Sequence, residues 1–264
     1  MITDLRSVFS KLRTGLRKKH TQNLVDAHPH QGNTFECVGA SRSSSHFFTD
    51  GSFTSFKKWQ FMHRARLGMV PLNAYKHGQV NSDKCRVCGH QAETLPHVIN
   101  NCMTHSTLIR KRQNDIVGRI KKAAMGRWEV ICEDHRLGTE NLRPDLVLKK
   151  DNDILIMDIT VLFENGLKAF EDARLVKEAK YTNLARELTT DGNKAKVEDI
   201  IVSSLGSWEP RNDRIIKRLC SSTYAKLMRK LIVSETIGNS CNIYFEHVSR
   251  VHRDHNIESG LPQI

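Results

Sequence analysis

Alternating apolar and polar positions in the second half of the chain predict a β-sheet whose strands are interleaved with helices. Strands are expected at residues 128–132, 146–148, 154–161 and 197–205, and helices at about 167–188 and 212–234. The strand at 154–161 is apolar on both faces apart from Asp158 and Thr160. Because such strands are usually covered on both sides, we expect this one to be buried within an α/β fold.

The first half of the chain is basic and less regular. Residues 1–30 carry apolar side chains at helical spacing, and another helix is expected over about 104–125. Residues 28–55 are rich in Ser, Gly, His and Thr, so we expect a loop or linker there. A basic, aromatic segment follows over 53–77, and Pro71 is expected to end its helix.

The charge balance favours a polyanionic partner. The chain has 41 basic and 29 acidic side chains among 264 residues, a formal net charge of +12. This surplus fits nucleic acid before an anionic membrane, although a basic protein without such a partner is the alternative. No apolar run approaches the roughly 20 residues of a transmembrane helix, and the N-terminus lacks a secretory signal. We therefore expect an intracellular protein whose seven cysteines stay reduced and favour metal binding over disulfides.

Three of the cysteines cluster in a pattern typical of a zinc knuckle, in which a C-x2-C pair supplies two tetrahedral ligands from one tight turn. The spacing is Cys85-x2-Cys88-x8-His97-x4-Cys102. His97 and Cys102 lie about one helical turn apart, so both can face the same side. The alternative is a chance cluster of reduced cysteines. His90 and His105 compete for the histidine position, and a ligand exchange with His105 stays open.

Two carboxylates mark a candidate catalytic centre. Asp145 follows Pro144, and Asp158 lies 13 residues later in the strand expected to be buried. A hairpin of this length can place both carboxylates side by side at one edge of the sheet. A carboxylate in such a strand is costly unless it is paired or binds a metal ion. Two hard oxygen ligands on neighbouring strands suit Mg²⁺, with water and phosphate completing its coordination.

The helix expected over 167–188 has one apolar stripe that should face the sheet, with a lysine in its middle. The stripe consists of Phe170, Ala173, Lys177, Tyr181, Leu184 and Leu188. Lys177 either extends to the rim, as lysines usually do, or brings its ammonium to the two carboxylates. There it could hold the attacking water or stabilise the phosphate in the transition state. Lys180 is the reserve candidate, and Tyr181 is expected to be a core aromatic with its hydroxyl at the rim.

In these motifs the chain resembles the C-terminal third of non-long-terminal-repeat retrotransposon proteins that carry a restriction-like endonuclease. The best-known members of that family insert into ribosomal RNA genes. The similar segments are residues 61–67 leading to Pro71, 93–102, 112–117, 142–147, 158–161 and 177–181. They follow the family's order, and the resemblance covers about residues 50 to 250.

The resemblance implies zinc at the four knuckle residues and a catalytic core of Asp145, Asp158 and Lys177, with Arg143, Lys180 and Tyr181 nearby. It implies nicking of target DNA, whose freed 3′ hydroxyl primes reverse transcription of the element's RNA. Type II restriction enzymes, which the fold resembles, usually place the lysine two residues after the second acid. That position is Thr160 here, and the lysine lies on the helix instead.

Two further departures from the family stand out. Gln113 lies where a histidine is expected in the basic helix. No paired-aspartate polymerase motif precedes the knuckle, and the 49 residues before Asp50 are too few for a polymerase palm. We therefore expect a fragment, a truncated copy or a host-retained remnant, without reverse transcriptase activity of its own.

These observations predict an α/β (α+β) chain: a restriction-endonuclease-like mixed sheet flanked by helices, after a mostly helical basic region and a CCHC zinc knuckle. The expected domains are a basic region at 1–80, the knuckle and basic helix at 81–125, and the endonuclease at 126–264. Nucleic-acid contacts are expected from basic side chains before and after the knuckle. These are Arg64, Arg66, Lys111, Arg112, Lys121 and Lys122.

The predicted function is Mg²⁺-dependent endonuclease activity in the nucleus, with Zn²⁺ as a structural ion. The expected partner is double-stranded target DNA, with ribosomal DNA as the candidate target and element RNA as a second candidate partner; no membrane is expected. The alternative is a catalytically inert, retrotransposon-derived module that binds nucleic acid through its knuckle. Because both acids and the lysine are present, the enzyme is favoured.

Overall fold

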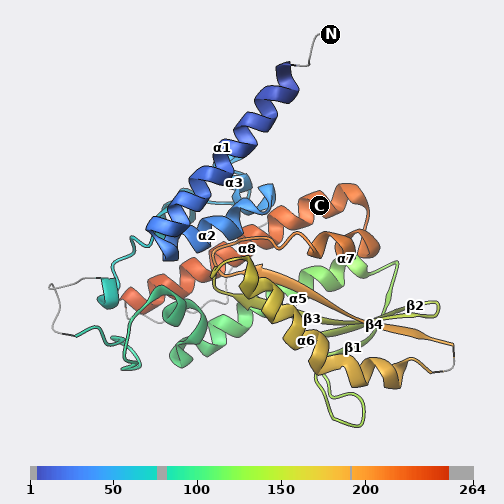
Figure 1. Ribbon diagram of the computed structural model, residues 1–264. Helices are drawn as coiled ribbons and strands as arrows, with labels where there is room; N and C mark the ends of the chain where they lie inside the picture. Colours follow the sequence, from blue (N-terminus) through green and yellow to red (C-terminus); the bar gives the residue numbers. More distant parts are fainter. Residues whose placement is uncertain (1–4, 76–81, 191, 250–264) are drawn as a thin grey trace.

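The computed structural model describes residues 5–75, 82–190 and 192–249, and it contains a four-stranded mixed sheet, seen toward the lower right of Figure 1. The strands are β1 (Glu129–Glu133), β2 (Leu146–Lys150), β3 (Asp153–Leu162) and β4 (Lys194–Ser203), and they lie in that order. The first three are antiparallel to one another, whereas β4 runs parallel to β3. The predicted mixed sheet flanked by helices is confirmed, and each predicted strand is present within a few residues of its expected bounds.

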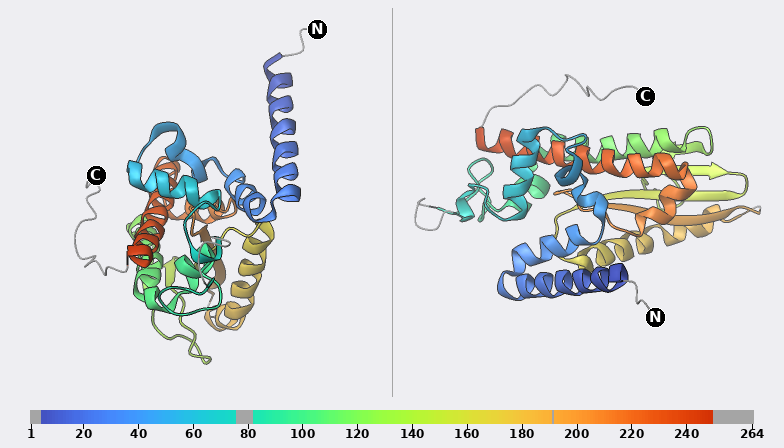
Figure 2. Two further views of the ribbon diagram at one scale, coloured as in Figure 1. Left: turned by 90° about the vertical axis from the view of Figure 1, so that its left-hand side faces the viewer. Right: turned by 90° about the horizontal axis from the view of Figure 1, so that it is seen from above.

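Helices cover both faces of this sheet (Figure 2). Helix α6 (Leu167–Leu188) has the predicted bounds; it connects the parallel strands β3 and β4 and packs on one face. Helices α5 (Ser106–Ala124) and α8 (Ser222–Ser249) pack against each other on the opposite face. The single helix predicted over 212–234 is wrong, because the extended backbone of Cys220 separates α7 (Asn212–Leu219) from α8.

The pleat of the strands separates two sets of buried side chains. On the α6 side, Val147, Ile154 and Ile156 pack with Tyr181 and Leu184 of the predicted apolar stripe. The alternate residues of the same strands face the main core with α5 and α8. They are Leu146, Leu148, Leu155, Met157 and Ile159. The strand expected to be buried is therefore covered by side chains on both faces.

The segment expected to be a loop, residues 28–55, is mostly helical, so that prediction is wrong. Helix α1 (Leu5–Ala27) is followed by α2 (Pro29–Gly39), a 3-10 turn (Arg42–Ser45) and α3 (His46–Asp50). Pro29 suits a helix start because its fixed φ fits the first turn, where no amide donor is needed. At Gly32 an added Cβ would lie 2.2 Å from the Cα of Val25, so this small residue allows α1 and α2 to approach closely.

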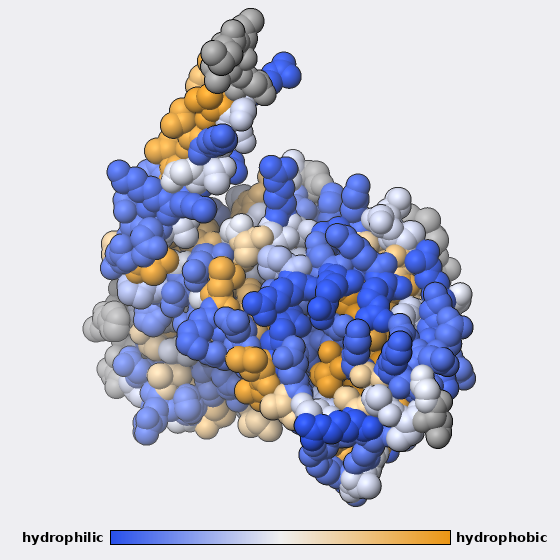
Figure 3. All heavy atoms as spheres, turned by 45° about the vertical axis from the view of Figure 1, so that its right-hand side comes forward, coloured by the Kyte–Doolittle hydropathy of each residue, from blue (hydrophilic) through white to orange (hydrophobic). Residues whose placement is uncertain are grey.

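Helix α1 projects away from the body of the protein and carries exposed apolar side chains along one side (Figure 3). They include Leu5, Phe9, Leu12 and Leu16. Helix α4 (Phe56–Arg66) ends before Pro71, because Gly68 turns the chain with a φ of +67°. None of the helices in the described ranges has the length and apolarity needed to cross a bilayer.

One cluster of buried side chains extends from Phe47 to Tyr244. It includes Leu95, Val98 and Ile99 beside the predicted knuckle as well as the sheet residues that face α5 and α8. The core therefore crosses the boundary predicted between residues 125 and 126, and the boundary at residues 80 and 81 lies outside the described residues. The three-domain division stays a prediction.

Candidate active site and metal centre

Three aspartates lie side by side across the sheet, one immediately before β2 and one each within β3 and β4. In the register of β2 and β3, Leu146 pairs with Met157, so one more step sets Asp145 opposite Asp158. In the parallel register of β3 and β4, Asp158 pairs with Asp199. We call Asp145, Asp158 and Asp199 the acidic row. The structure thus brings the two predicted acids together and adds a third that the sequence analysis did not single out.

Two donors hold the carboxylate of Asp145. The amide of Ile159 on β3 donates to its Oδ2 at 2.6 Å, and Gln113 of α5 donates to both oxygens at 3.2 Å. Burial raises the pKa of Asp145; the Ile159 amide opposes this effect and the charge of Asp158 adds to it. Gln113, which departs from the family pattern, therefore lies in the site and orients the first acid.

Helix α6 directs two side chains at the two oxygens of Asp158. The ammonium of Lys177 lies 2.6 Å from Oδ2, and the hydroxyl of Tyr181 lies 2.8 Å from Oδ1. Asp158 is 3% exposed, whereas the Lys177 side chain is 26% exposed. Lys177 therefore reaches Asp158 from the middle of the apolar stripe while its side chain stays partly open to solvent.

Tyr181 is completely buried, so the expectation of a hydroxyl at the rim is wrong. The hydroxyl also lies 3.1 Å from the carbonyl of Arg143 and accepts a hydrogen bond from Lys180 Nζ at 2.9 Å. Burial, reinforced by the charge of Asp158, raises the pKa of Tyr181 well above its usual range. The phenol therefore remains protonated and serves as a donor that fixes Asp158.

The other two predicted site residues, Lys180 and Arg143, direct their charged groups at residues outside the acidic row. Lys180 is exposed, and its ammonium lies 4.6 Å from the centre of the Tyr181 ring as well as on its hydroxyl. The guanidinium of Arg143 turns away from the acidic row and bonds Asp134, with one nitrogen 2.8 Å from its Oδ2. Lys180 thus acts on Asp158 only through Tyr181, and Arg143 contributes its backbone carbonyl.

Asp199 is buried without a hydrogen bond to either carboxylate oxygen among the described residues. Burial raises its pKa to about 7; Arg174 opposes the shift, and the charge of Asp158 adds to it. The guanidinium of Arg174 donates to the Asp199 backbone carbonyl at 3.2 Å and to the Glu209 carboxylate at 2.6 Å. The alternation of apolar and polar residues predicted a strand that includes Asp199, but its position beside Asp158 follows only from the parallel register of β3 and β4.

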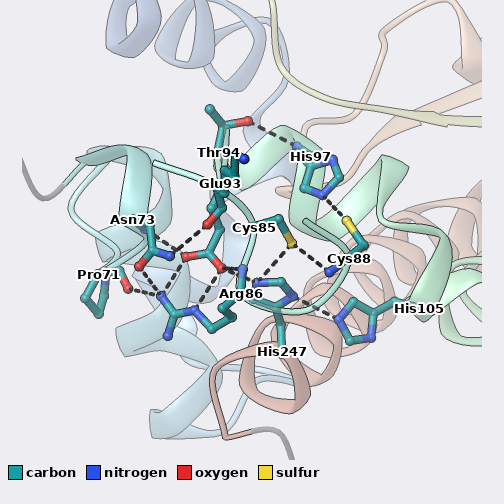
Figure 4. Close-up of polar contacts among 11 residues, drawn as sticks. Pro71, Asn73, Cys85, Arg86, Cys88, Glu93, Thr94, His97, His105 and His247 are labelled. Atoms are coloured by element: carbon teal, nitrogen blue, oxygen red, sulfur yellow. Dashed lines mark hydrogen bonds and ion pairs between the residues drawn. The ribbon is translucent and has the colours of Figure 1, made fainter. Parts of the chain in front are cut away.

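The four predicted zinc ligands converge, with their ligand atoms all within 4.8 Å of one another, and Figure 4 shows Cys85, Cys88 and His97 among them. They are Cys85, Cys88, His97 and Cys102. The turn after Cys85 is closed by the Gly89 amide, which donates to the Cys85 carbonyl, and Gly89 has a φ of +74°. A compact set of three thiols and one imidazole fits a tetrahedral Zn²⁺ site.

A π-helical turn over His97–Asn101 aligns the second pair of ligands. The amide of Cys102 donates to the carbonyl of His97 at 2.7 Å, five residues back. An α-helix aligns residues four apart, whereas this wider turn brings residues five apart to the same side. The x4 spacing between His97 and Cys102 is therefore matched by the local backbone.

Helix α8 packs against the Cys-His cluster through His247, a residue that the sequence analysis did not predict. Its Nε2 lies 2.8 Å from Glu93 Oε1 and 4.0 Å from Cys85 Sγ, and its Nδ1 lies 3.0 Å from His105 Nε2. The same groups also form two overlapping candidate ligand sets. These are Cys102 with His105 and His247, and Cys85 with Glu93 and His247.

The competing histidines are therefore placed differently. The ring of His90 stacks on His97 with the centroids 4.2 Å apart, and His105 is buried against His247. Burial, reinforced by the neighbouring thiols, raises the pKa of Cys102 to about 12. A bound cation would instead favour the thiolate of Cys102, because a coordinating thiol is deprotonated by the metal's charge.

The predicted nucleic-acid contacts divide into exposed and buried residues. Arg64 and Lys122 are exposed; Lys111 pairs with Asp115 and Lys121 with Glu133 on the surface. Arg66 and Arg112 are buried, so their prediction as nucleic-acid contacts is wrong for this conformation. The guanidinium of Arg66 bonds the carbonyls of Ser44 and Leu205, and that of Arg112 bonds Ser240 and Asn100.

Comparison with known proteins finds a retrotransposon relative. Over 222 residues the chain is 25% identical to the "Retrovirus-related Pol polyprotein from type-1 retrotransposable element R2" of Popillia japonica. The similarity covers 79% of this chain and 44% of that polyprotein, so the chain spans less than half of this relative's length. No protein-family model matches the chain. The predicted resemblance to a non-long-terminal-repeat retrotransposon polyprotein is confirmed.

Proposed function

We propose that the protein is a Mg²⁺-dependent DNA endonuclease with a restriction-like fold. The observation that carries this proposal is the pairing of Asp145 with Asp158 on adjacent strands, with the Lys177 ammonium 2.6 Å from Asp158. Two carboxylates and a lysine in this arrangement fit metal-assisted phosphodiester hydrolysis. The buried carboxylate oxygens of Asp199, which have no hydrogen-bond partner among the described residues, fit a site that binds a cation.

The residues of the site have separable roles. The carboxylates of Asp145 and Asp158 would hold Mg²⁺, which when bound lowers the pKa of a coordinated water and neutralises phosphate charge. The Ile159 amide and Gln113 orient Asp145, and Tyr181 orients Asp158. Lys177 presents a cation at the solvent-open side of the site, where negative charge grows on the phosphate in the transition state.

The biological reaction proposed is nicking of double-stranded target DNA, so that the freed 3′ hydroxyl primes reverse transcription of the element's RNA. Similarity to the R2 polyprotein supports this, and ribosomal DNA is the candidate target. The polymerase would be supplied by another part of such a polyprotein or by another chain. The zinc knuckle and exposed basic side chains such as Arg64 and Lys122 would hold nucleic acid, and the site of action would be the nucleus.

The test is incubation of the zinc-loaded protein with supercoiled plasmid carrying ribosomal DNA, with and without Mg²⁺. We expect Mg²⁺-dependent conversion to nicked circles, abolished by Asp145→Ala and by Asp158→Ala. Asp172→Ala is the matched control, because this aspartate is exposed on α6 and pairs with Lys168. Binding of the two inactive variants to DNA should persist, since each loses a negative charge. Nicking that survives both substitutions would refute the assignment.

An inert binding module is the second candidate function. The net charge of +12 and the Cys-His cluster support nucleic-acid binding without requiring catalysis. Under this alternative, the wild type binds the same plasmid with strong salt dependence but leaves it supercoiled in Mg²⁺ and in Mn²⁺. The two candidates therefore differ in one assay, provided that binding is measured on the same preparation.

A further inference from the structure

Asp199 is a buried acid whose charge has no direct partner among the described residues. The residue is 1% exposed, and neither carboxylate oxygen accepts a hydrogen bond from the described part of the chain. A buried, unpaired carboxylate is costly, and such groups are normally paired or bind a metal ion. Alternation along β4 turns Asp199 toward α6, and the parallel register sets it beside Asp158.

The cations near the acidic row do not compensate for Asp199. Lys177 is the one basic side chain of the described residues that forms an ion pair with any member of the row, and it contacts Asp158. Arg174 approaches Asp199 only at its backbone carbonyl, and its charge is balanced by the Glu209 carboxylate at 2.6 Å. When all three carboxylates are ionised, they therefore share one ion-paired lysine.

The spacing of the acidic row favours two positions for cations over one. Neighbouring strands lie about 4.8 Å apart, so Asp145 and Asp199 flank Asp158 at about one strand spacing on either side. The three aspartates are not among the groups whose ligand atoms all lie within 4.8 Å of one another, so they do not form one preassembled three-carboxylate site. Positions in adjacent strand gaps lie about 4.8 Å apart, which is close to the roughly 3.5–4 Å that separates paired catalytic metal ions.

We propose that Asp158 and Asp199 form a second divalent-cation position beside the one between Asp145 and Asp158. Asp158, the central residue of the row, is shared by both. This inference rests on the proposed function for the first position, but its evidence is the uncompensated carboxylate of Asp199. The second cation would lie where β3 and β4 run in parallel, on the face covered by α6.

The experiment counts bound Mn²⁺ by electron paramagnetic resonance and calorimetric titration of zinc-loaded protein. Wild type should bind two Mn²⁺ ions beyond the zinc. Asp199→Asn should bind one, and Asp145→Asn should also bind one, because each loses a different gap. Asp158→Asn should weaken both. Glu198→Gln is the matched control, since it removes a buried acid from the same strand but one paired with Arg214 and Arg218.

The folding of the variant is checked by thermal unfolding without added Mn²⁺. Asp199→Asn should unfold at a higher temperature than wild type, since it removes a buried charge at nearly constant shape. Asp199→Ser, which is smaller and also neutral, provides a second variant should Asp199→Asn fail to fold. Wild type should gain thermal stability from Mn²⁺, and either variant should show a smaller gain.

Two outcomes overturn the inference: a wild type that binds a single Mn²⁺, or Asp199 variants that bind as many ions as wild type. A failure of the proposed function looks different. In that case wild type binds two Mn²⁺ ions and Asp199→Asn binds one, but no preparation nicks the plasmid.

Discussion

Arg64 and Arg66 lie two residues apart on α4, and their structural surroundings predict opposite consequences of substitution. Arg66 is 3% exposed, and its guanidinium donates to the Ser44 carbonyl at 2.7 Å and to the Leu205 carbonyl at 2.8 Å. Arg66→Ala would leave both buried carbonyls without this donor, at about 1–3 kcal/mol each. We therefore expect a loss of about 4 kcal/mol in the free energy of unfolding. Arg64 is exposed, so Arg64→Ala should change stability by no more than about 0.5 kcal/mol.

Chemical denaturation and thermal unfolding of both variants provide the assay, followed by DNA binding at several salt concentrations. For a chain of this size, 4 kcal/mol corresponds to a lower Tm by roughly 8–16 °C for Arg66→Ala. Arg64→Ala should keep the wild-type Tm but weaken binding to duplex DNA and reduce the log–log salt slope by about 0.9 if it contacts one phosphate. The reasoning is refuted if Arg66→Ala unfolds like wild type and loses DNA affinity instead.

Further substitutions test the two candidate sites. Lys177→Ala should slow nicking by about 10²–10³-fold, because it removes a cation aimed at charge that grows in the transition state. Lys180→Ala should slow nicking less, and a larger effect of Lys180→Ala than of Lys177→Ala would exchange the roles of the two lysines. Tyr181→Phe should reduce nicking less than Lys177→Ala while zinc content stays the same; equal losses would show that the phenol does more than orient Asp158. Metal analysis should find one zinc per chain, and Cys88→Ser should lower this content, whereas full retention would contradict the ligand set. Without added Mg²⁺, the raised pKa of Asp199 predicts a contribution to the free energy of unfolding that is present below about pH 4 and is lost as pH rises through about 7. Asp199→Asn should remove this pH-dependent loss of stability. A variant with the same pH profile of stability as wild type would contradict the prediction.

Local patterns were sufficient wherever a site depends on residues near one another in the chain. The C-x2-C turn, the x4 spacing of His97 and Cys102, and the apolar stripe of α6 were all visible in the sequence. The stripe also identified Lys177 as unusual, and the structure places its ammonium on Asp158. The hairpin pairing of Asp145 with Asp158 followed from their short separation.

What the sequence could not provide was the pairing of distant elements. Asp199 joins the acidic row only through the parallel register of β3 and β4, which no local period encodes. His247 reaches the knuckle because α8 packs there, 145 residues after Cys102 in the chain. Arg66 looked like a surface cation by residue type, yet its partners Ser44 and Leu205 come from segments far away in the sequence. The helical content of residues 28–55 was hidden by a composition that is typical of loops.

Helix α8 connects the Cys-His cluster to the sheet that carries the acidic row, and so sets the distance between the two candidate sites. It contains 28 residues, a length of about 42 Å at 1.5 Å per residue. Its C-terminal part contacts Cys85, Glu93 and His105 through His247, and the helix also packs on β4. Because the helix is continuous, nucleic acid gripped at the knuckle would be presented to the acidic row at a set offset. One added turn would lengthen that offset by about 5.4 Å, or between one and two base-pair steps of duplex DNA. The phosphate that is cut would then be selected by the geometry of a rigid spacer as well as by base contacts.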